Sequence, residues 1–393
     1  MTKRLAMSLF LVSVFSLESI SSTKVLKIGL YHKNEPQKII IQPGDGSYTI
    51  QSNGNTVYEL QPGAILKIDC ENNKIRIATL GELLGSFDDI EIRRNTWGSS
   101  LKIQRTDGNK KQREYNDDFL ISPKSGKLRI INEVYIEHYV AGVVESEAGS
   151  KEPKEYYKVQ SVICRTYALN NRRRHEAEGF QLCDKVHCQV YHSRSLANPD
   201  ILRGTQETIG IVIVDSDINL VTAAFHSNCG GYTCNSEDVW SGYLDYLRAR
   251  VDENCVSEPH SYWRHTLTVD EWLTYLYTKH GYPINDPIAR AAALSYCPDR
   301  REIHFDPDND GLDRINFKNI RYDLKLLSAY FSVETELDTV ILEGHGYGHG
   351  VGLCQEGAMN MAQNGKPYDE ILHYYYKNIH LVNLSVIDFF RAE

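Results

Sequence analysis

The sequence predicts an α+β protein in which a small N-terminal β domain precedes a larger mixed α+β domain. Short alternating apolar runs fill residues 24–130, and apolar residues recur at helical spacing from residue 134 onward. The chain has 393 residues, a length that suits two or three domains. We therefore expect a β-rich accessory domain over residues 24–130 and a second domain over residues 131–393.

The first domain is predicted from apolar segments separated by turn residues. The candidate strands are residues 25–30, 38–42, 47–50, 74–77 and 90–92. A Pro-Gly-Asp-Gly turn at residues 43–46 separates two of them. No reactive constellation is apparent in this part of the sequence, so we expect it to position the second domain or hold a ligand.

The second domain is predicted to mix helices and strands. Its candidate helices are residues 136–148, about 153–174, 268–279 and 368–376, and its candidate strands are residues 208–214 and 221–225. Pro153 suits a first helical turn, and the arginines at positions 172–174 would suit the last turn of the same helix.

Composition and the N-terminal segment limit the class of protein. A net charge of −9 disfavours a nucleic-acid binder and an anionic membrane surface. Lys3 and Arg4 precede an apolar run over residues 5–17 and small residues at Ser19 and Ser21. This pattern is typical of an export signal over residues 1–22, with an uncleaved anchor as the alternative. We expect an exported protein of the periplasm or cell envelope, with no integral membrane domain beyond this segment.

Nine cysteines, an odd number, leave at least one thiol unpaired unless it binds a metal or a partner. Cys183, His187 and Cys188 offer soft metal ligands at close spacing. The alternative is a disulfide, for which Cys183–Cys188 and Cys229–Cys234 are candidate pairs in an exported chain.

Glu147 is the candidate for acid–base chemistry. On a helix over residues 136–148 it shares a face with Ile136, Val140 and Val144, whereas Glu145 points to the opposite face. An apolar environment raises the pKa of a carboxyl group and keeps it protonated, as a general acid requires. The structural alternative is a buried Glu147 paired with Arg165.

An acidic segment at residues 306–311 mimics the start of a calcium loop. The twelfth position of such a loop should hold a bidentate acid, but here it is Phe317. A polar hairpin turn between Ile303 and Ile315 explains the segment better.

Five sequence blocks, in one order along the chain, resemble the stage II sporulation protein D / amidase-enhancer family. They are residues 139–147, 158–169, 182–191, 225–233 and 346–358. They fall within residues 131 to about 380, a region of about two thirds of the chain.

The resemblance implies a peptidoglycan lytic transglycosylase with a catalytic domain that carries a substrate groove. The family's catalytic Glu lies in a Ser-Glu pair that matches Ser146 and Glu147. This carboxyl would protonate the oxygen between N-acetylmuramic acid and N-acetylglucosamine, and would then help the C6 hydroxyl attack C1 to leave a 1,6-anhydro end. Peptidoglycan glycan strands are the implied partner, together with cell-wall amidases.

The resemblance also implies binding residues, and the sequence departs from the family in two places. The candidate substrate-binding residues are Arg165, Tyr167, His226, Ser227, Gly348, His349 and Gln355. A tight structural loop is the alternative for those in the Gly/His-rich segments. No cofactor is required, but a structural zinc ion at Cys183, His187 and Cys188 is compatible with the family. Ala148-Gly149 replaces the usual Met-Pro, and Cys354-Gln355-Glu356-Gly357 replaces Ser-Gln-Trp-Gly. We expect the loss of an aromatic residue from the groove to alter which sugars bind.

Two other functions remain open at this point. A non-catalytic protein that binds glycan and enhances a cell-wall amidase is the main rival. A structural partner in a wall-remodelling complex is the third reading, and the β domain gives it some support. Glu147 on an apolar face favours the enzyme.

Overall fold

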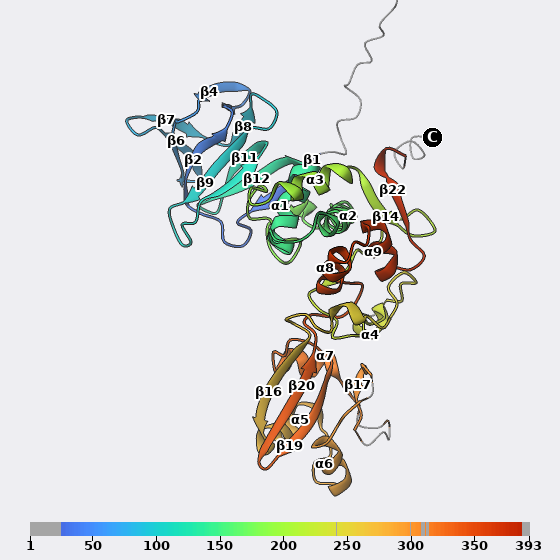
Figure 1. Cartoon of the computed structure of the whole chain (residues 1–393). Coiled ribbons are helices and arrows are strands. Elements are labelled where there is room, and N and C mark those ends of the chain that lie inside the picture. The colour runs from blue at the N-terminus through green and yellow to red at the C-terminus, as the bar shows by residue number, and fades with distance from the viewer. Residues whose placement is uncertain (1–24, 241, 299, 308–310, 312–313, 387–393) are drawn as a thin grey trace, which may run out of the picture. The chain divides into compact units, whose positions relative to one another are not determined.

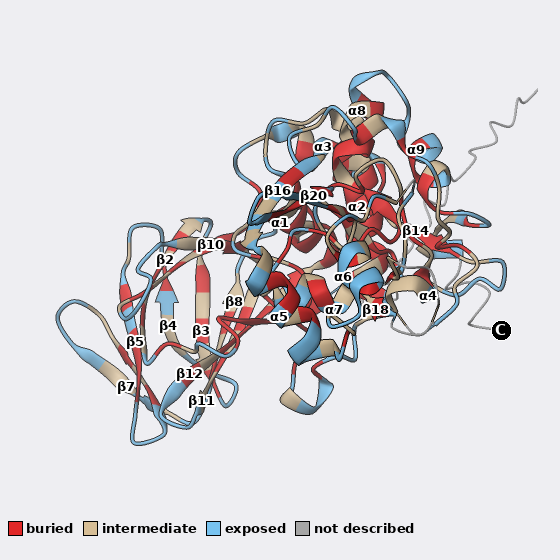
Figure 2. Ribbon diagram, turned by 90° about the horizontal axis from the view of Figure 1, so that it is seen from below, coloured by how far each residue is buried: buried red, intermediate tan, exposed pale blue. Residues whose placement is uncertain are grey.

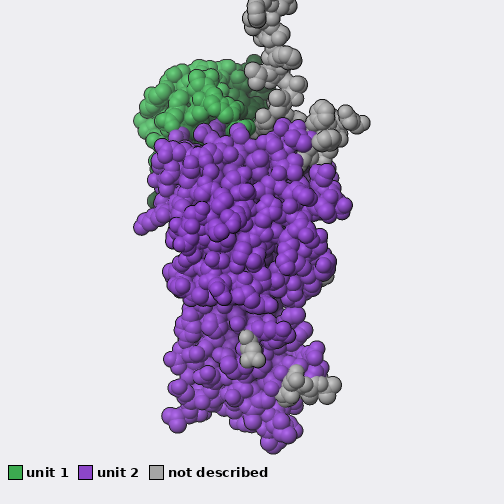
Figure 3. All heavy atoms as spheres, turned by 45° about the vertical axis from the view of Figure 1, so that its right-hand side comes forward, with its two compact units in different colours: residues 1–136 green, residues 137–393 purple. Residues whose placement is uncertain are grey.

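The computed structural model describes residues 25–240, 242–298, 300–307, 311 and 314–386 (Figure 1). The chain divides into two compact units, Met1–Ile136 and Glu137–Glu393, coloured separately in Figure 3. The predicted α+β class is confirmed. The predicted export signal at residues 1–22 lies outside the described residues. Among the residues that the structure describes, no helix has the length and apolar character needed to span a membrane.

The first unit consists of antiparallel strands arranged in two sheets. One sheet contains, in spatial order, β1 (Val25–Leu30), β12 (Lys127–Tyr135), β11 (Asp118–Lys124), β8 (Ile90–Arg94), β3 (Tyr48–Ser52) and β4 (Asn55–Leu60). The other contains β10 (Arg113–Asn116), β9 (Ser100–Arg105), β2 (Lys38–Asp45), β5 (Leu66–Glu71), β6 (Lys74–Ala78) and β7 (Leu83–Phe87). All five predicted strands of this unit are confirmed.

Alternating side chains explain how the two sheets build one core. Along β2, Ile39 and Ile41 are fully buried and pair with Ile68 and Ile103 on the flanking strands. Contacts of β11 with β6 and of β12 with β5 join the sheets.

The second unit begins with two helices that carry much of its core. α1 (Ile136–Ala148) starts directly after β12, as predicted. α2 (Lys154–Asn170) is buried along most of its length (Figure 2) and packs against α3 (Pro199–Glu207), β14 (Ile211–Val214), α8 (Gln355–Gln363) and α9 (Tyr368–Tyr375). The helices predicted near α1 and α9 are confirmed.

Two predicted boundaries in this unit are wrong. α2 ends at Asn170 rather than at residue 174, because the backbone N–H and side chain of Asn171 both bind the Tyr167 carbonyl. The arginines at positions 172–174 therefore follow the helix. The strand predicted at residues 221–225 exists only as β15 (Phe225–His226), which pairs in parallel with β21 (Leu353–Cys354). The strand predicted at residues 208–214 is confirmed as the shorter β14, which pairs with β22 (His380–Asn383).

A three-stranded sheet with helices forms the remaining part of this unit. β16 (Tyr262–Thr268), β20 (Thr339–His345) and β19 (Phe331–Glu336) pack with α5 (Val269–His280), α6 (Pro287–Ala293) and α7 (Phe317–Asp323) around a core that includes Trp272 and Phe305. A Thr268–Glu271 capping box starts α5, and left-handed Gly281 ends it, close to the predicted bounds. The short elements are β13 (Leu182–Cys183), α4 (Ser236–Val239), β17 (His304–Phe305) and β18 (Ile315–Asn316).

The acidic segment at residues 306–311 lies between β17 and β18. These two strands pair antiparallel, as the predicted hairpin requires. The Asp306 carboxylate accepts hydrogen bonds from Arg314 Nε at 3.1 Å and from the Gly311 N–H at 3.4 Å. Residues 308–310 lie outside the described part of the chain. The contacts of Asp306 favour the polar turn over a calcium loop.

Candidate functional site

Glu147 lies in the last turn of α1, at the edge of the buried face. Ile136, Val140 and Val144 on that face are buried, and Glu147 itself is partly buried. Its Oε1 accepts a hydrogen bond from the Val190 N–H at 2.9 Å. Burial raises the pKa of Glu147, and the Val190 hydrogen bond opposes part of that rise. The direction of the shift is the one predicted from the sequence.

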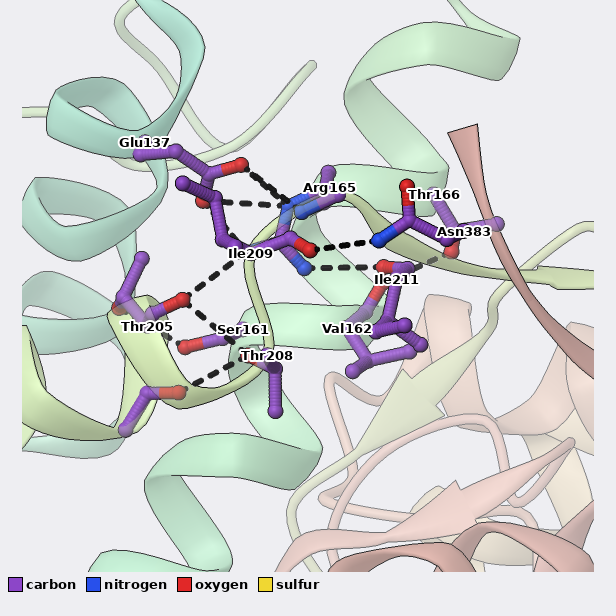
Figure 4. A network of polar contacts seen from close by, with 12 residues as sticks. Glu137, Ser161, Val162, Arg165, Thr166, Thr205, Thr208, Ile209, Ile211 and Asn383 are labelled. Carbon is purple, nitrogen blue, oxygen red and sulfur yellow. Dashed lines mark hydrogen bonds and ion pairs between the residues drawn. The ribbon is translucent and has the colours of Figure 1, made fainter. Parts of the chain in front are cut away.

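Arg165 pairs with Glu137 and not with Glu147 (Figure 4). Its Nε lies 3.0 Å from Oε1 of Glu137 and its Nη2 lies 2.5 Å from Oε2. Nη1 donates to the Ile211 carbonyl at 2.9 Å, and the side chain of Arg165 is fully buried. The alternative pairing of Arg165 with Glu147 is therefore not formed. The guanidinium is fully enclosed, and contact between Arg165 and substrate stays a prediction.

Glu145 has a separate structural role. Its Oε2 accepts hydrogen bonds from Ser195 Oγ at 2.9 Å, the Leu196 N–H at 2.8 Å and the Ala197 N–H at 2.9 Å. Glu145 thus anchors the loop before α3, whereas Glu147 contacts residue 190. The two carboxylates therefore differ in partners although they lie two positions apart.

One face of α2 continues from Glu147 toward α8. Tyr156, Gln160 and Cys164 recur every four residues, so they line a single helix face over about 12 Å. Burial raises the pKa of the Cys164 thiol, and the neighbouring Glu147 carboxylate raises it further. Gln160 Nε2 donates to Tyr156 Oη at 2.9 Å, and Gln355 of α8 lies next to Tyr156.

Two buried amide nitrogen atoms at this face have no hydrogen-bond acceptor. Among the residues that the structure describes, Gln189 Nε2 and Gln355 Nε2 make no hydrogen bond. An unsatisfied buried donor costs about 1–3 kcal/mol, so such atoms suit a ligand that brings acceptors. Gln355 was predicted; Gln189 was missed as a site residue, although it directly precedes the residue that binds Glu147.

His226 and His349 form a second cluster where β15 meets β21. Their rings lie 5.4 Å apart, and Trp240 lies 5.3 Å from His349. Burial, His349 and Arg301 hold the pKa of His226 well below its usual range. Burial and the charges of Arg321 and Arg301 lower the pKa of His349 to about 4, so both imidazoles are neutral near pH 7.

The loop around these histidines is tightly built, in keeping with the structural alternative. Gly348 has a φ of +120°, and a Cβ at this position would lie 2.7 Å from His226 Cβ. The Val351 N–H donates to His349 Nδ1 at 3.0 Å, and His226 Nδ1–H donates to the Val351 carbonyl at 3.2 Å. The Ser227 carbonyl accepts the Glu356 N–H at 3.0 Å, at the start of α8.

A cavity of about 240 Å³ adjoins His349 and is rich in cations. Arg301, Lys318 and Arg321 line it, and all three donate to main-chain carbonyls. Asp238 and Glu302 also line the cavity, but no carboxylate among the described residues forms an ion pair with these three cations. The cavity therefore suits an anionic group.

Tyr167 contacts the segment that leads to residue 190. Its Oη accepts a hydrogen bond from Arg174 Nη1 at 2.5 Å, and Arg174 also donates to the His187 carbonyl at 3.0 Å. Burial raises the pKa of Tyr167 and the Arg174 charge opposes that rise. These contacts give Tyr167 a role in holding this segment.

The predicted ligands Cys183, His187 and Cys188 converge, and the structure adds His175. Their ligand atoms all lie within 4.8 Å of one another. Cys188 Sγ lies 3.4 Å from His175 Nε2 and 3.7 Å from His187 Nδ1. His175 Nδ1 lies 2.7 Å from the Glu178 carboxylate, and its Nε2 faces Cys188 Sγ within the cluster. Two thiols and two imidazoles are a donor set that suits a closed zinc site. A disulfide would use the two thiols and leave both imidazoles without a role.

His175 was missed because it falls in the stretch that follows α2 and carries no motif of its own. Both predicted disulfides lack support, since all nine cysteines are free and Cys229 lies beside Cys255 and not beside Cys234. The four-residue cluster directly precedes Gln189 and Val190. It therefore fixes the segment whose N–H binds Glu147.

Comparison with known proteins agrees with this arrangement. A family model described as "Stage II sporulation protein" matches residues 124–214, which include α1, α2 and the four-residue cluster. Together with the relatives below, this match supports the predicted resemblance to the stage II sporulation protein D / amidase-enhancer family.

Three relatives have low sequence identity to this chain but align with more than half of its length. The chain is 27% identical over 262 residues to stage II sporulation protein D of Bacillus subtilis, covering 63% of this chain and 74% of that protein. It is 26% identical over 277 residues to an uncharacterized protein of Brachyspira hyodysenteriae, covering 70% and 74%. It is 26% identical over 284 residues to the amidase enhancer of Bacillus subtilis, covering 60% of this chain but 39% of that protein.

Proposed function

We propose that this protein is a peptidoglycan lytic transglycosylase in which Glu147 is the single general acid and base. Its family and its amidase-enhancer relative support a role at the cell wall. The observation that carries the proposal is the partly buried Glu147, whose pKa is raised and whose Oε1 is held by the Val190 N–H. The raised pKa favours the protonated form that a general acid needs, and the Val190 hydrogen bond orients the carboxyl group.

The reaction needs one carboxyl and no water. Protonated Glu147 gives its proton to the oxygen that joins N-acetylmuramic acid to N-acetylglucosamine, and the C1–O bond breaks. The Glu147 carboxylate then accepts the proton of the C6 hydroxyl as that oxygen bonds to C1, which leaves a 1,6-anhydro end. The acid is restored, so the paired carboxyls of ordinary glycosidases are not required.

The neighbouring groups suit a glycan. The amide donors of Gln189 and Gln355 match the carbonyl oxygens of N-acetyl groups. His349 and the cations beside it match the carboxylates that peptidoglycan carries on its lactyl groups and stem peptides. Substrate at the wall implies that the protein acts outside the cytoplasm.

We further propose that His175, Cys183, His187 and Cys188 hold a structural zinc ion. A zinc ion with four protein ligands supplies folding energy and no reactive position. In this chain it would fix the segment that presents the Val190 N–H to Glu147.

A second candidate function is that of a non-catalytic enhancer of a cell-wall amidase. The amidase-enhancer relative favours it, as does the tight structural role of the Gly348 loop. In that case Glu147 would serve only to hold residue 190.

Digestion of purified glycan strands, with and without stem peptides, distinguishes these functions when the products are read by mass spectrometry. We expect 1,6-anhydro-muramyl ends. Reducing ends would indicate a hydrolase with a second carboxyl. Strands that bind but remain uncut would favour the enhancer.

A further inference from the structure

A second cluster of metal-binding side chains lies apart from the groups that the proposed reaction uses. It consists of Cys229, Asp252, Cys255 and Cys354, all buried, with ligand atoms within 4.8 Å of one another. Cys229 follows β15, Asp252 caps a short 3₁₀ turn that ends at Cys255, and Cys354 ends β21. Residues from three distant parts of the chain therefore converge on one point.

The spacing of the ligand atoms suits one small ion. Cys229 Sγ lies 3.3 Å from Cys255 Sγ and 3.4 Å from Asp252 Oδ2. Ligands about 2.0–2.3 Å from a tetrahedral zinc ion lie roughly 3.5–3.8 Å from one another. These two separations lie within a few tenths of an ångström of that geometry, and all four ligand atoms lie within 4.8 Å of one another.

Main-chain groups are placed to stabilise thiolates at this point. The Cys229 N–H donates to Cys354 Sγ at 3.3 Å, and the Gly231 N–H contacts Cys255 Sγ. Tyr375 Oη donates to Asp252 Oδ2 at 2.8 Å. No described Lys, Arg or His forms an ion pair with Asp252, so a buried carboxylate lacks a cation.

A Cys229–Cys255 disulfide is the competing explanation of the short sulfur–sulfur distance. It would use two of the four groups and leave the Cys354 thiol and the Asp252 carboxylate beside it. A metal ion uses all four. Three thiolates and one carboxylate are borderline-soft donors that favour Zn²⁺ over Mg²⁺ or Ca²⁺.

We propose that Cys229, Asp252, Cys255 and Cys354 bind a Zn²⁺ ion in a closed, structural site. The ion ties the end of β15, the 3₁₀ turn and the start of α8 together. Cys354 immediately precedes Gln355, so the site also fixes the residue that lies next to Tyr156. This inference holds whether or not the protein cleaves glycan.

Metal content measured by mass spectrometry tests the site on the full chain produced with zinc and dialysed. We expect about two zinc ions per chain in the wild type, one for each four-residue cluster. Cys354→Ser and Asp252→Asn should each lower the content by one. Cys234→Ser is the matched control, because Cys234 is buried but belongs to neither cluster, and it should retain both ions.

Two outcomes would overturn the proposal. One is unchanged zinc content in Cys354→Ser, checked as folded by circular dichroism. The other is a Cys229–Cys255 disulfide, found by mass mapping of the zinc-supplied chain without reductant.

If Cys354→Ser does not fold, a spectroscopic measurement tests whether the second cluster binds a metal ion. In a chain carrying Cys183→Ser and Cys188→Ser, bound Co²⁺ should still show thiolate charge-transfer absorption, which must then arise from the second cluster. Absence of that absorption in the folded double variant would contradict the site.

Discussion

Glu147 and Glu145 show how environment separates two carboxyl groups on one helix. Burial raises the pKa of Glu147, and a general acid works only while protonated. The rate of glycan cleavage should therefore fall as pH rises through the raised pKa of Glu147. Initial rates of anhydro-end formation across the acidic to alkaline range measure this. A rate that only increases with pH would contradict the assignment.

The buried pair of Glu137 and Arg165 supports the helices that position Glu147. Glu137→Gln leaves the enclosed guanidinium without its counter-charge and should lower the free energy of unfolding by about 3–5 kcal/mol. Lys154→Met breaks the exposed Lys154–Glu207 pair and should cost about 0–1 kcal/mol. Urea denaturation followed by tryptophan fluorescence compares the two. Equal effects would contradict the structural role of the buried pair.

The environment of a residue could be predicted from the sequence where it depends only on the spacing of apolar residues within one helix. The position of Glu147 follows from the spacing of apolar residues on α1, so its partial burial was predictable. The partner of Arg165 was not, because Glu137 and Glu147 both lie on α1 and only the packing of α2 chooses between them. His175 and Asp252 join their clusters through the tertiary fold, which sequence spacing does not encode.

At the scale of elements, Gly142 lets the loop before α3 approach α1. A Cβ at this position would clash with the Ser193 carbonyl and lie 2.7 Å from the Tyr191 ring. Alanine normally stabilises a helix interior relative to glycine by about 0.5–1 kcal/mol. We expect the opposite sign here: Gly142→Ala should destabilise the protein by about 1–3 kcal/mol through overpacking.

Thermal denaturation measures that change, with Gly242→Ala as the control, because a Cβ there meets no atom within 4 Å. The cleavage rate of Gly142→Ala should also fall, since residue 190 lies in the displaced segment. A stabilised and fully active Gly142→Ala would show that the loop adapts freely.

The sequence predicted whether a segment is a helix or a strand better than it predicted the residues at which that helix or strand ends. The β unit, α1, α5 and α9 follow from apolar periodicity and capping residues. α2 ends early because Asn171 caps it, which outweighs the preference of the following arginines for a helix end. Residues 221–224 are apolar enough for a strand but form no continuous ladder. The Val221 N–H donates to the Ile213 carbonyl of β14, whereas the Ala224 carbonyl accepts from the Leu353 N–H of β21.

At the scale of the whole molecule, we expect metal to support the second unit. Zinc at the two four-residue clusters would bind the folded chain in preference to the unfolded chain, and so would raise its stability. Chelation should therefore lower the melting temperature of the full chain, and added zinc should restore it. Calorimetry measures this, with Cys70→Ser as a control in the first unit that should keep the full response. A melting temperature that does not respond to the chelator would contradict both metal sites.

The central claim is that Glu147 performs the cleavage, and a comparison of two variants tests it most directly. Glu147→Gln and Glu145→Gln each replace one carboxyl on α1 by an amide, and both are digested with glycan strands beside the wild type. We predict that 1,6-anhydro-muramyl ends persist with Glu145→Gln and vanish with Glu147→Gln, while both variants stay folded. Undiminished anhydro ends from folded Glu147→Gln would contradict the account.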